Sequence, residues 1–177
     1  MLSVKLVQLV EAHWEQISER IVHKIYTDPR LAKISTLSES EIRERAREVV
    51  KNIGEWLGTS RDEALAQRCE ALGRQRFEDG IPLHEVVLAR FIIKEGLMEF
   101  VHDHAFVETS LELYAERELE KSVGNLFDRM IYYVIRGYEE AMREVDQRAS
   151  AAAAHHSSRL PRSGPRDSMR FPERFVP

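Results

Sequence analysis

The chain contains a single cysteine, Cys69, so no disulfide can form within it. Long apolar runs are also missing, since the longest are Val86–Ile93, which contains an arginine, and Met130–Ile135. Neither approaches the roughly 18 residues of a membrane-spanning helix. The stretch Leu2–Val10 is interrupted by polar residues and is not followed by the small-residue cleavage site of a signal peptide. We therefore expect a cytoplasmic protein in a reducing compartment, with no membrane segment.

Catalytic signatures are missing as well. The sequence has no phosphate-binding glycine loop, and no serine, histidine and acidic residue have the spacing of a catalytic triad. His84 and Glu85 superficially resemble a phospho-acceptor pair, but apolar residues follow them and no nucleotide-binding region accompanies them. These absences favour a regulatory or sensory protein over an enzyme.

Positive charge is scarce in most of the chain. The net charge of −4 divides unevenly, because the residues from Gln147 onward carry six arginines against Asp167 and Glu173, leaving −8 on the first 146 residues. Nucleic-acid affinity comes mainly from cations that neutralise phosphates. An acidic body is therefore a poor nucleic-acid surface, and we expect no nucleic-acid partner.

What the sequence does have is helical periodicity, and no segment alternates as a strand does. Capping boxes at 38–41 and 60–63 begin two helices, and the breaks Asp28-Pro29 and Gly80-Ile81-Pro82 end two others. We predict an all-α helical bundle of about five helices. The fourth, apolar on most sides between Val86 and Ile93, should be its buried centre. The fifth is long enough that we expect a bend near Gly124. The helices cover about 7–27, 39–58, 61–78, 83–103 and 110–149.

Composition changes at Ser150, where an alanine run is followed by prolines, serines and arginines, with four of the six prolines at 161, 165, 172 and 177. Such a segment is too polar to form a packed core. We interpret residues 1–149 as a helical sensory or regulatory domain and residues 150–177 as a flexible, disordered tail. His155–Ser158 resembles the linker of an expression tag, which leaves a natural tail and a cloning remnant as alternatives.

The candidate metal ligands are Glu99 and His102, which lie three residues apart and so share one helix face, as di-iron bundles require. A second such pair is missing. Haem would need a histidine that reaches into an apolar cavity, and the candidates are His84 and His102 at the two ends of the fourth helix and His13 beside Trp14. Each is more simply a surface histidine. We therefore expect no cofactor and no metal, with haem binding as an alternative.

Ionisable residues set among apolar ones are more informative. Arg90 lies on the apolar line of the fourth helix, and a charge in a core must be paired or must face a cavity. The alternatives are an internal ion pair, a surface arginine with a buried stem, or a pocket for an anionic ligand. For the last we predict a pocket near Arg76, Arg90 and Tyr133. Four glycines inside helical patterns indicate either close helix approach or bends: Gly73, Gly96, Gly124 and Gly137.

Two segments together resemble a known family. They are Leu72–Val87, with the sequence LGRQRFEDGIPLHEVV, and Phe127–Glu139, with the sequence FDRMIYYVIRGYE. Over about Leu6 to Val145 the chain resembles the N-terminal helical domain of RsbRD-type RsbT co-antagonists, which also precedes bacterial sensor kinases. The resemblance implies a globin-like but haem-free input domain of bacterial stress signalling. In that family the last helix leads directly into an output domain, and only the tail follows here.

From these observations we predict a non-enzymatic signalling input module that forms a homodimer and associates with a signalling protein partner. Helix interfaces favour aromatic residues. We therefore predict that Phe127, Met130, Tyr133 and Tyr138 form the dimer or partner surface. The alternative is a small-molecule or haem-binding sensor domain that uses the arginine pocket.

Overall fold

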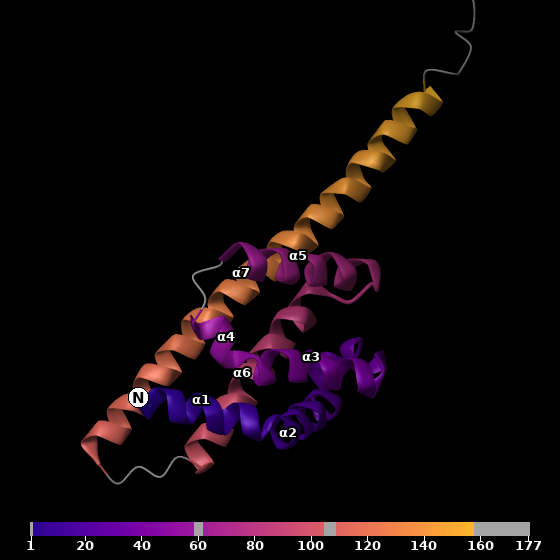
Figure 1. Cartoon of the computed structure of the whole chain (residues 1–177). Helices are drawn as coiled ribbons and strands as arrows, with labels where there is room; N and C mark the ends of the chain where they lie inside the picture. The colour runs from indigo at the N-terminus through magenta and orange to yellow at the C-terminus, as the bar shows by residue number, and fades with distance from the viewer. Residues whose placement is uncertain (1, 59–61, 105–108, 158–177) are drawn as a thin grey trace, which may run out of the picture. The chain divides into compact units, whose positions relative to one another are not determined.

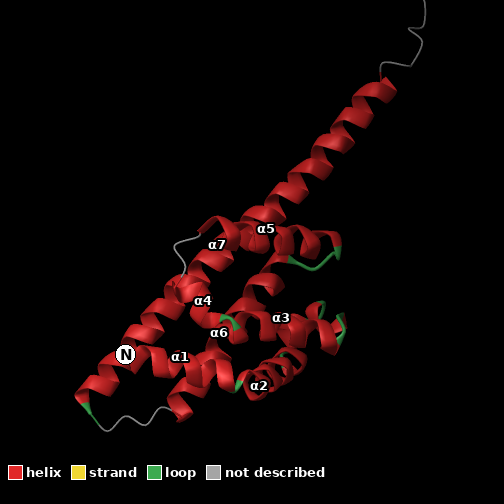
Figure 2. Ribbon diagram, viewed as in Figure 1, coloured by secondary structure: helices red, strands yellow, loops and turns green. Residues whose placement is uncertain are grey.

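The computed structural model describes residues 2–58, 62–104 and 109–157 (Figure 1). These residues form seven α-helices, two short 3-10 helices and no strand, which confirms the all-α prediction (Figure 2). The chain divides into two compact units, Met1–Arg143 and Glu144–Pro177. The helices are α1 (Leu2–Ala12), α2 (Trp14–Thr27), α3 (Glu39–Lys51), α4 (Ile53–Gly58), α5 (Asp62–Glu78), α6 (Leu83–His104) and α7 (Ser110–Ser157), with 3-10 helices η1 (Pro29–Leu31) and η2 (Ile34–Thr36).

The count exceeds the predicted five because two predicted helices are each divided by one residue. His13 separates α1 from α2, and Asn52 separates α3 from α4. Both have φ of −111° and ψ near 20°, outside helical geometry. The amide of Asn52 donates to the Glu48 carbonyl at 2.8 Å, and the Nδ1 atom of His13 lies 2.8 Å from the Leu9 carbonyl oxygen. Hydrophobic periodicity continues across both breaks, so it could not reveal them.

Local capping chemistry positions the other helix ends. The Ser38 hydroxyl accepts a hydrogen bond from Glu41 N at 3.2 Å at the start of α3, which confirms Ser38 as the N-cap, while the Glu41 carboxylate lies beside Arg76. At the end of α5, Gly80 has a φ of 68°, and Ile81 N donates to the Arg76 carbonyl at 3.0 Å. This left-handed glycine reverses the chain into α6, where Pro82 immediately precedes the helix. The predicted capping box at 60–63 begins in residues that lie outside the described ranges.

Helix α7 begins with a capping box and continues without the bend that we expected. Thr109 N donates to Glu112 at 2.9 Å, and Glu112 N donates to the Thr109 hydroxyl at 3.2 Å. Gly124 lies inside the helix, so the predicted bend there was wrong. The helix also includes residues 150–157, which we had assigned to the tail, and residues 158–177 lie outside the described ranges.

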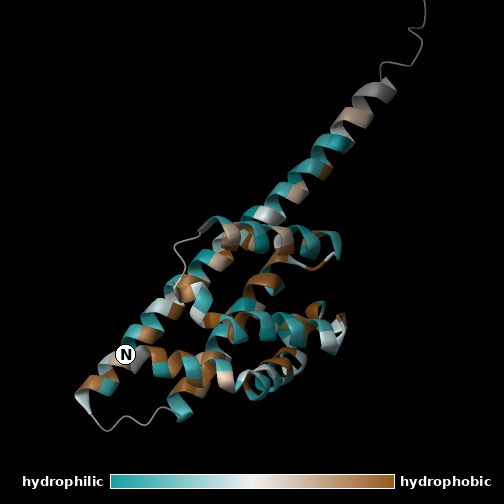
Figure 3. Ribbon diagram, viewed as in Figure 1, coloured by the Kyte–Doolittle hydropathy of each residue, from teal (hydrophilic) through white to brown (hydrophobic). Residues whose placement is uncertain are grey.

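Within the first unit, α2 packs against α3 and α6, while α1 packs against α3 and α4 (Figure 1). Hydrophilic and hydrophobic residues alternate along these helices, as amphipathic helices require (Figure 3). Helix α6 has buried residues from Glu85 to Val101 and contacts α1, α2 and α5, which places it at the centre of the bundle, although Phe91 is 44% exposed. The largest fully buried side chains include Phe100 of α6, Phe127 of α7 and Ile17 and Ile21 of α2. Among the described helices, none is long and apolar enough to cross a membrane.

Helices α5 and α7 cross with their backbones in contact at two glycines. A Cβ atom on Gly73 would lie far inside van der Waals contact with the Val134 carbonyl oxygen and 2.8 Å from Tyr138 N. A Cβ atom on Gly137 would clash equally with the Glu70 carbonyl oxygen. Only glycine allows this approach, so these two glycines serve close helix contact. Gly124 has no atom within 4 Å of its Cβ position and has no such role.

Polar contacts secure the same crossing. The Tyr138 hydroxyl donates to the Ile81 carbonyl at 3.0 Å, and its ring meets Phe77 edge-on at 5.3 Å between centroids. Arg136 of α7 forms an ion pair with Glu70 of α5. The segment 134–138 of α7 is therefore bound to α5 and to the turn that follows it.

Candidate functional site

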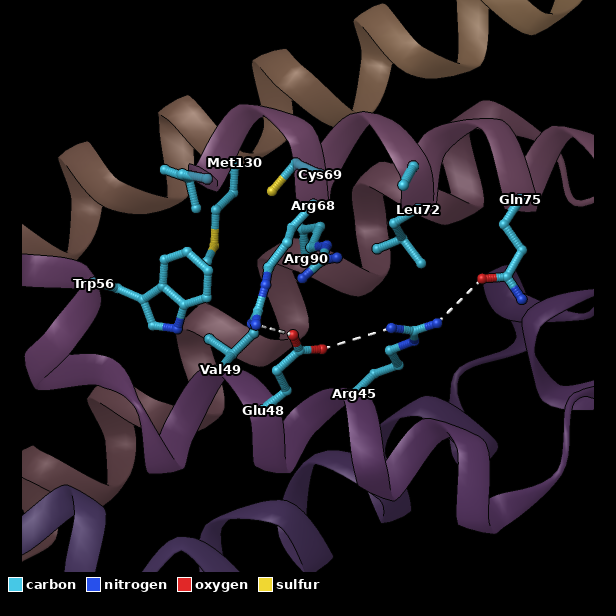
Figure 4. Close-up of a pocket in the computed structure, with 12 residues that line it drawn as sticks. Arg45, Glu48, Val49, Trp56, Arg68, Cys69, Leu72, Gln75, Arg90 and Met130 are labelled. Atoms are coloured by element: carbon cyan, nitrogen blue, oxygen red, sulfur yellow. Dashed lines mark hydrogen bonds and ion pairs between the residues drawn. The ribbon is translucent and has the colours of Figure 1, made fainter. Parts of the chain in front are cut away.

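A pocket of about 220 Å³ lies between α3, α4, α5 and α6 and reaches one residue of α7 (Figure 4). Its lining combines an apolar wall with three arginines and one glutamate, so the lining carries a net charge of +2. This concentration of positive charge contrasts with the acidic remainder of the first 146 residues. The lining residues are Arg45, Glu48, Val49, Trp56, Leu65, Arg68, Cys69, Ala71, Leu72, Gln75, Arg90 and Met130.

Helical spacing brings most of these side chains to one place. Arg45, Glu48 and Val49 lie three and four residues apart on one face of α3, and Leu65, Arg68, Cys69 and Leu72 do the same on α5. The faces of α3 and α5 that lie toward each other thus contain both charged and apolar residues, and α6 contributes Arg90 between them.

Three of the polar side chains are joined to one another. The Glu48 carboxylate contacts Arg68 Nη1 at 2.7 Å and Arg45 Nη1 at 3.5 Å, and Arg45 Nη2 donates to the Gln75 amide oxygen at 3.1 Å (Figure 4). The side chains of Arg68 and Arg45 are 60% and 38% exposed, so this network is open to solvent and adds little stability. Glu48 balances one of the two arginines that it contacts.

Arg90 is the exception in this pocket. Only 7% of the residue is exposed, and in the part of the chain that the structure describes its guanidinium forms no hydrogen bond or ion pair. Figure 4 shows the guanidinium among the lining side chains, in the region of Cys69 and Arg68. Burial lowers the pKa of Arg90, and the charges of Arg45 and Arg76 lower it further, whereas Cys69 and the carboxylate of Glu48 act in the opposite direction. An arginine nevertheless stays protonated at neutral pH, so the pocket contains an uncompensated buried cation.

Two other polar groups face the same region. The indole Nε1 of Trp56 is buried and has no hydrogen-bond partner in the described residues. Burial raises the pKa of the Cys69 thiol, and the charge of Arg90 opposes this in part. Cys69 is therefore a protonated wall residue at neutral pH, as expected for a buried structural thiol. Trp56 supplies a hydrogen-bond donor that is not used within the fold.

Of the three residues predicted for the pocket, Arg90 lines it and Arg76 lies next to it. Arg76 and Arg90 both line a second, smaller cavity of about 50 Å³ on the other side of Arg90. Arg76 is 6% exposed and is compensated, because its Nη1 atom lies 2.8 Å from Glu41 Oε1 and donates to Asp79 at 2.9 Å. Its contact with Glu41 is a close ion pair without hydrogen-bond geometry.

Tyr133 lines neither cavity. It is half-buried on α7, where its ring packs edge-on against Tyr132 at 5.2 Å and the Arg136 guanidinium lies 5.1 Å from its centroid. The sequence prediction thus located the pocket from one of its lining residues, Arg90.

The residues predicted for the partner surface are divided by the structure. Phe127 and Met130 are 0% and 2% exposed, so they belong to the core of the chain itself and are not available at a surface. Tyr138 is partly buried against Phe77. The exposed aromatic residue of this segment is Tyr132, at 58%. Tyr132 follows Ile131 in a run where every residue is apolar or aromatic, so neither face of the helix could be assigned to solvent from sequence.

The candidate metal and haem ligands lie away from both cavities. His84 is exposed, Glu99 binds Lys24 at 2.6 Å, and the ring of His102 lies 3.3 Å from Glu116. Within the described ranges no group of three or more His, Cys, Asp or Glu residues is arranged to hold a metal ion. Neither cavity has a histidine in its lining.

Sequence reasoning missed most of the pocket and one buried acid. Arg45, Glu48 and Arg68 are not among the residues predicted for the pocket, and the three-residue spacing of Arg45 and Glu48 was the available signal. Glu85, 5% exposed in the first turn of α6, accepts hydrogen bonds from Lys33 N and Ile34 N at 2.9 Å. It holds the loop after α2, which gives this carboxylate a structural role.

The comparison with known proteins agrees with the fold. The model of one protein family, described as the RsbT co-antagonist protein rsbRD N-terminal domain, matches residues 15–153. The match includes every residue that lines the pocket as well as the crossing of α5 and α7. No curated protein and no solved structure matches the chain.

Proposed function

The chain belongs to the family of RsbT co-antagonist rsbRD N-terminal domains, and on that premise we propose that it is a non-enzymatic input module of bacterial stress signalling. In this proposal it resides in the cytoplasm, forms a homodimer and acts on a signalling protein partner by association. The family match carries the assignment to signalling. The properties of α7 support the association.

Helix α7 has an exposed apolar strip on the side opposite its core residues. Tyr132 and Met142 are 58% and 43% exposed, and Ile135 lies between them at a spacing that keeps all three on one helical face. Exposed aromatic and methionine side chains are enriched in protein interfaces. A second copy of the chain is the occupant that we propose for this strip, because two identical apolar helix faces can cover each other about a twofold axis.

The crossing with α5 supports transmission through α7. Because the backbones touch at Gly73 and Gly137, a shift of α5 displaces α7 directly and is not absorbed by flexible side chains. Shifts of an ångström or two at helix interfaces are sufficient to switch signalling proteins.

The test is the oligomeric state of the full chain, measured by analytical ultracentrifugation across the micromolar range. We expect a dimer for the wild type and a monomer for Tyr132→Glu, with the helical circular dichroism unchanged. Tyr132 is a better position than Tyr133, because Tyr133 packs against the core and its substitution would also disturb the fold.

The matched control is Phe91→Glu, because Phe91 is an aromatic residue on a different helix, α6, and is 44% exposed. This variant should remain a dimer. A wild-type chain that is monomeric at every concentration would contradict the homodimer. If Tyr132→Glu and Phe91→Glu were both dimeric, the strip on α7 would not be the interface.

A further inference from the structure

We propose that the pocket between α3, α5 and α6 binds a small organic carboxylate with an aromatic or similarly compact apolar body, held by Arg90. This site does not depend on the association proposed above, since it lies inside a single chain. A monomeric chain that binds such a ligand would support it as well as a dimeric one.

The charges in the pocket call for an anion. Glu48 contacts both Arg45 and Arg68 and acts on Arg90 only at longer range, so Arg90 has no ion pair of its own in the described residues. A guanidinium that is more than nine-tenths buried is strongly destabilising unless an anion pairs with it. A carboxylate matches the planar fork of arginine with two parallel hydrogen bonds. The missing counterion of Arg90 is therefore supplied by the ligand.

A comparison with Arg76 shows that this lack is particular to Arg90. Both arginines are buried to a similar degree, at 6% and 7% exposed, and both line the smaller cavity. Arg76 has Glu41 and Asp79 within 3 Å, so the fold compensates it fully. The fold can evidently place carboxylates beside a buried arginine and does not do so at Arg90.

The rest of the lining favours an organic ligand over an inorganic ion. Val49, Leu65, Leu72 and Met130 make one wall apolar, and the indole of Trp56 closes another (Figure 4). The volume of about 220 Å³ exceeds the roughly 150 Å³ in which an engineered apolar cavity holds benzene. A single ring with a carboxylate fits this space.

Occupation of the pocket would reach α7, because Met130 belongs both to its lining and to the core side of that helix. The other lining residues of α5 lie on the face adjacent to the glycine crossing. A ligand that orders the pocket therefore also acts on the crossing of α5 and α7.

The experiment is isothermal titration calorimetry of the full chain with benzoate and phenylacetate. Benzyl alcohol serves as the neutral analogue, and inorganic phosphate serves as an anion that has no apolar body. We expect the two carboxylates to bind with dissociation constants of roughly 0.1–1 mM, as such small ligands allow. Benzyl alcohol and phosphate should bind at least ~10-fold more weakly, because benzyl alcohol lacks the negative charge and phosphate lacks the apolar ring. The emission of Trp56, recorded in a Trp14→Phe chain that retains it as the only tryptophan, should shift on binding.

Two variants test the assigned residue. Arg90→Met should weaken benzoate binding at least ~10-fold, since the bidentate partner is lost. Its thermal midpoint should be at or above that of the wild type, so lost binding cannot be attributed to unfolding. The control Arg43→Met removes an arginine of α3 that binds Glu39 on the surface and should leave affinity unchanged.

Three results would overturn the proposal. One is equal affinity of Arg90→Met and wild type for benzoate, and another is equal affinity for benzyl alcohol and benzoate. The third is binding of phosphate alone, which would show an inorganic anion site. A failure of the dimer test would leave all of these measurements interpretable, because none of them uses the oligomeric state.

Discussion

Helix α5 has two adjacent faces with opposite properties. On the face toward α7, Gly73 allows backbone contact, and Glu70 forms an ion pair with Arg136. On the face toward α3, Leu65, Arg68 and Cys69 border a cavity that contains the uncompensated Arg90. The first face is closely packed against α7, whereas the second borders an open cavity and a buried arginine that has no ion pair. Natural proteins commonly retain such local costs at functional sites, so the contrast separates a structural contact from a binding site.

The largest effect should come from filling the tight face. Gly137→Ala places a methyl group against the Glu70 backbone, where no flexible side chain can yield. We expect the free energy of unfolding to fall by about 3 kcal/mol, as measured by urea denaturation. The control is Gly124→Ala in the same helix, which has open space at its Cβ position and should raise the free energy of unfolding by up to ~1 kcal/mol. Equal effects of the two substitutions would show that the backbones do not touch.

The next largest effect is the difference in the free energy of unfolding between substitutions of the two buried arginines. Arg90→Met removes an uncompensated charge and should raise the free energy of unfolding by about 1–2 kcal/mol without ligand. Arg76→Met leaves Glu41 and Asp79 without their cation and should lower it by a similar amount, reduced because both acids are about one-third exposed. Thermal and urea unfolding of both variants measure this difference. Destabilisation by Arg90→Met would mean that Arg90 is compensated after all.

A smaller effect is expected from the hydroxyl that secures α7 to the end of α5. Tyr138→Phe removes the hydrogen bond to the Ile81 carbonyl and should lower the free energy of unfolding by about 1 kcal/mol. Tyr132→Phe removes an exposed hydroxyl from the same helix and should change it by less than ~0.5 kcal/mol. If the two variants were equally stable, the contact with Ile81 would add nothing.

The smallest effect is the pH dependence of the free energy of unfolding that Cys69, on the pocket side of α5, should cause. The folded state raises the pKa of Cys69 above its ordinary value of 9.0, so the thiol ionises first in the unfolded chain. The unfolded state then binds fewer protons than the folded one, and stability decreases as the pH rises past about 9. Cys69→Ala should lack this decrease. Urea unfolding of both proteins at neutral and alkaline pH gives the comparison, and parallel pH profiles would contradict it.

The predicted dimer or partner surface on α7 shows where sequence reasoning reached its limit. Phe127 and Met130 were assigned to a surface and are in the core, whereas the neighbouring Tyr132 is exposed. The segment Phe127–Tyr138 is apolar or aromatic on most sides, so its pattern identifies a helix without identifying its inner face. The candidate pocket was located through Arg90, because a charge on an apolar stripe is visible in sequence. Its other arginines lie on ordinary polar faces and carry no such signal.

The sequence by itself determined the helical class, the cap at Ser38, the reversal at Gly80 and the burial of α6, because periodicity and capping depend on residues within one or two turns. Tertiary structure alone decided which glycine is a contact and which is not, since Gly124 and Gly137 occupy similar helical contexts and differ only in what lies opposite. It also decided that Arg76 meets Glu41 while Arg90 meets no acid in the described chain. Glu41 lies in a different helix from Arg76, and only the packing of α3 against α5 brings the two together, so no local pattern distinguishes these arginines.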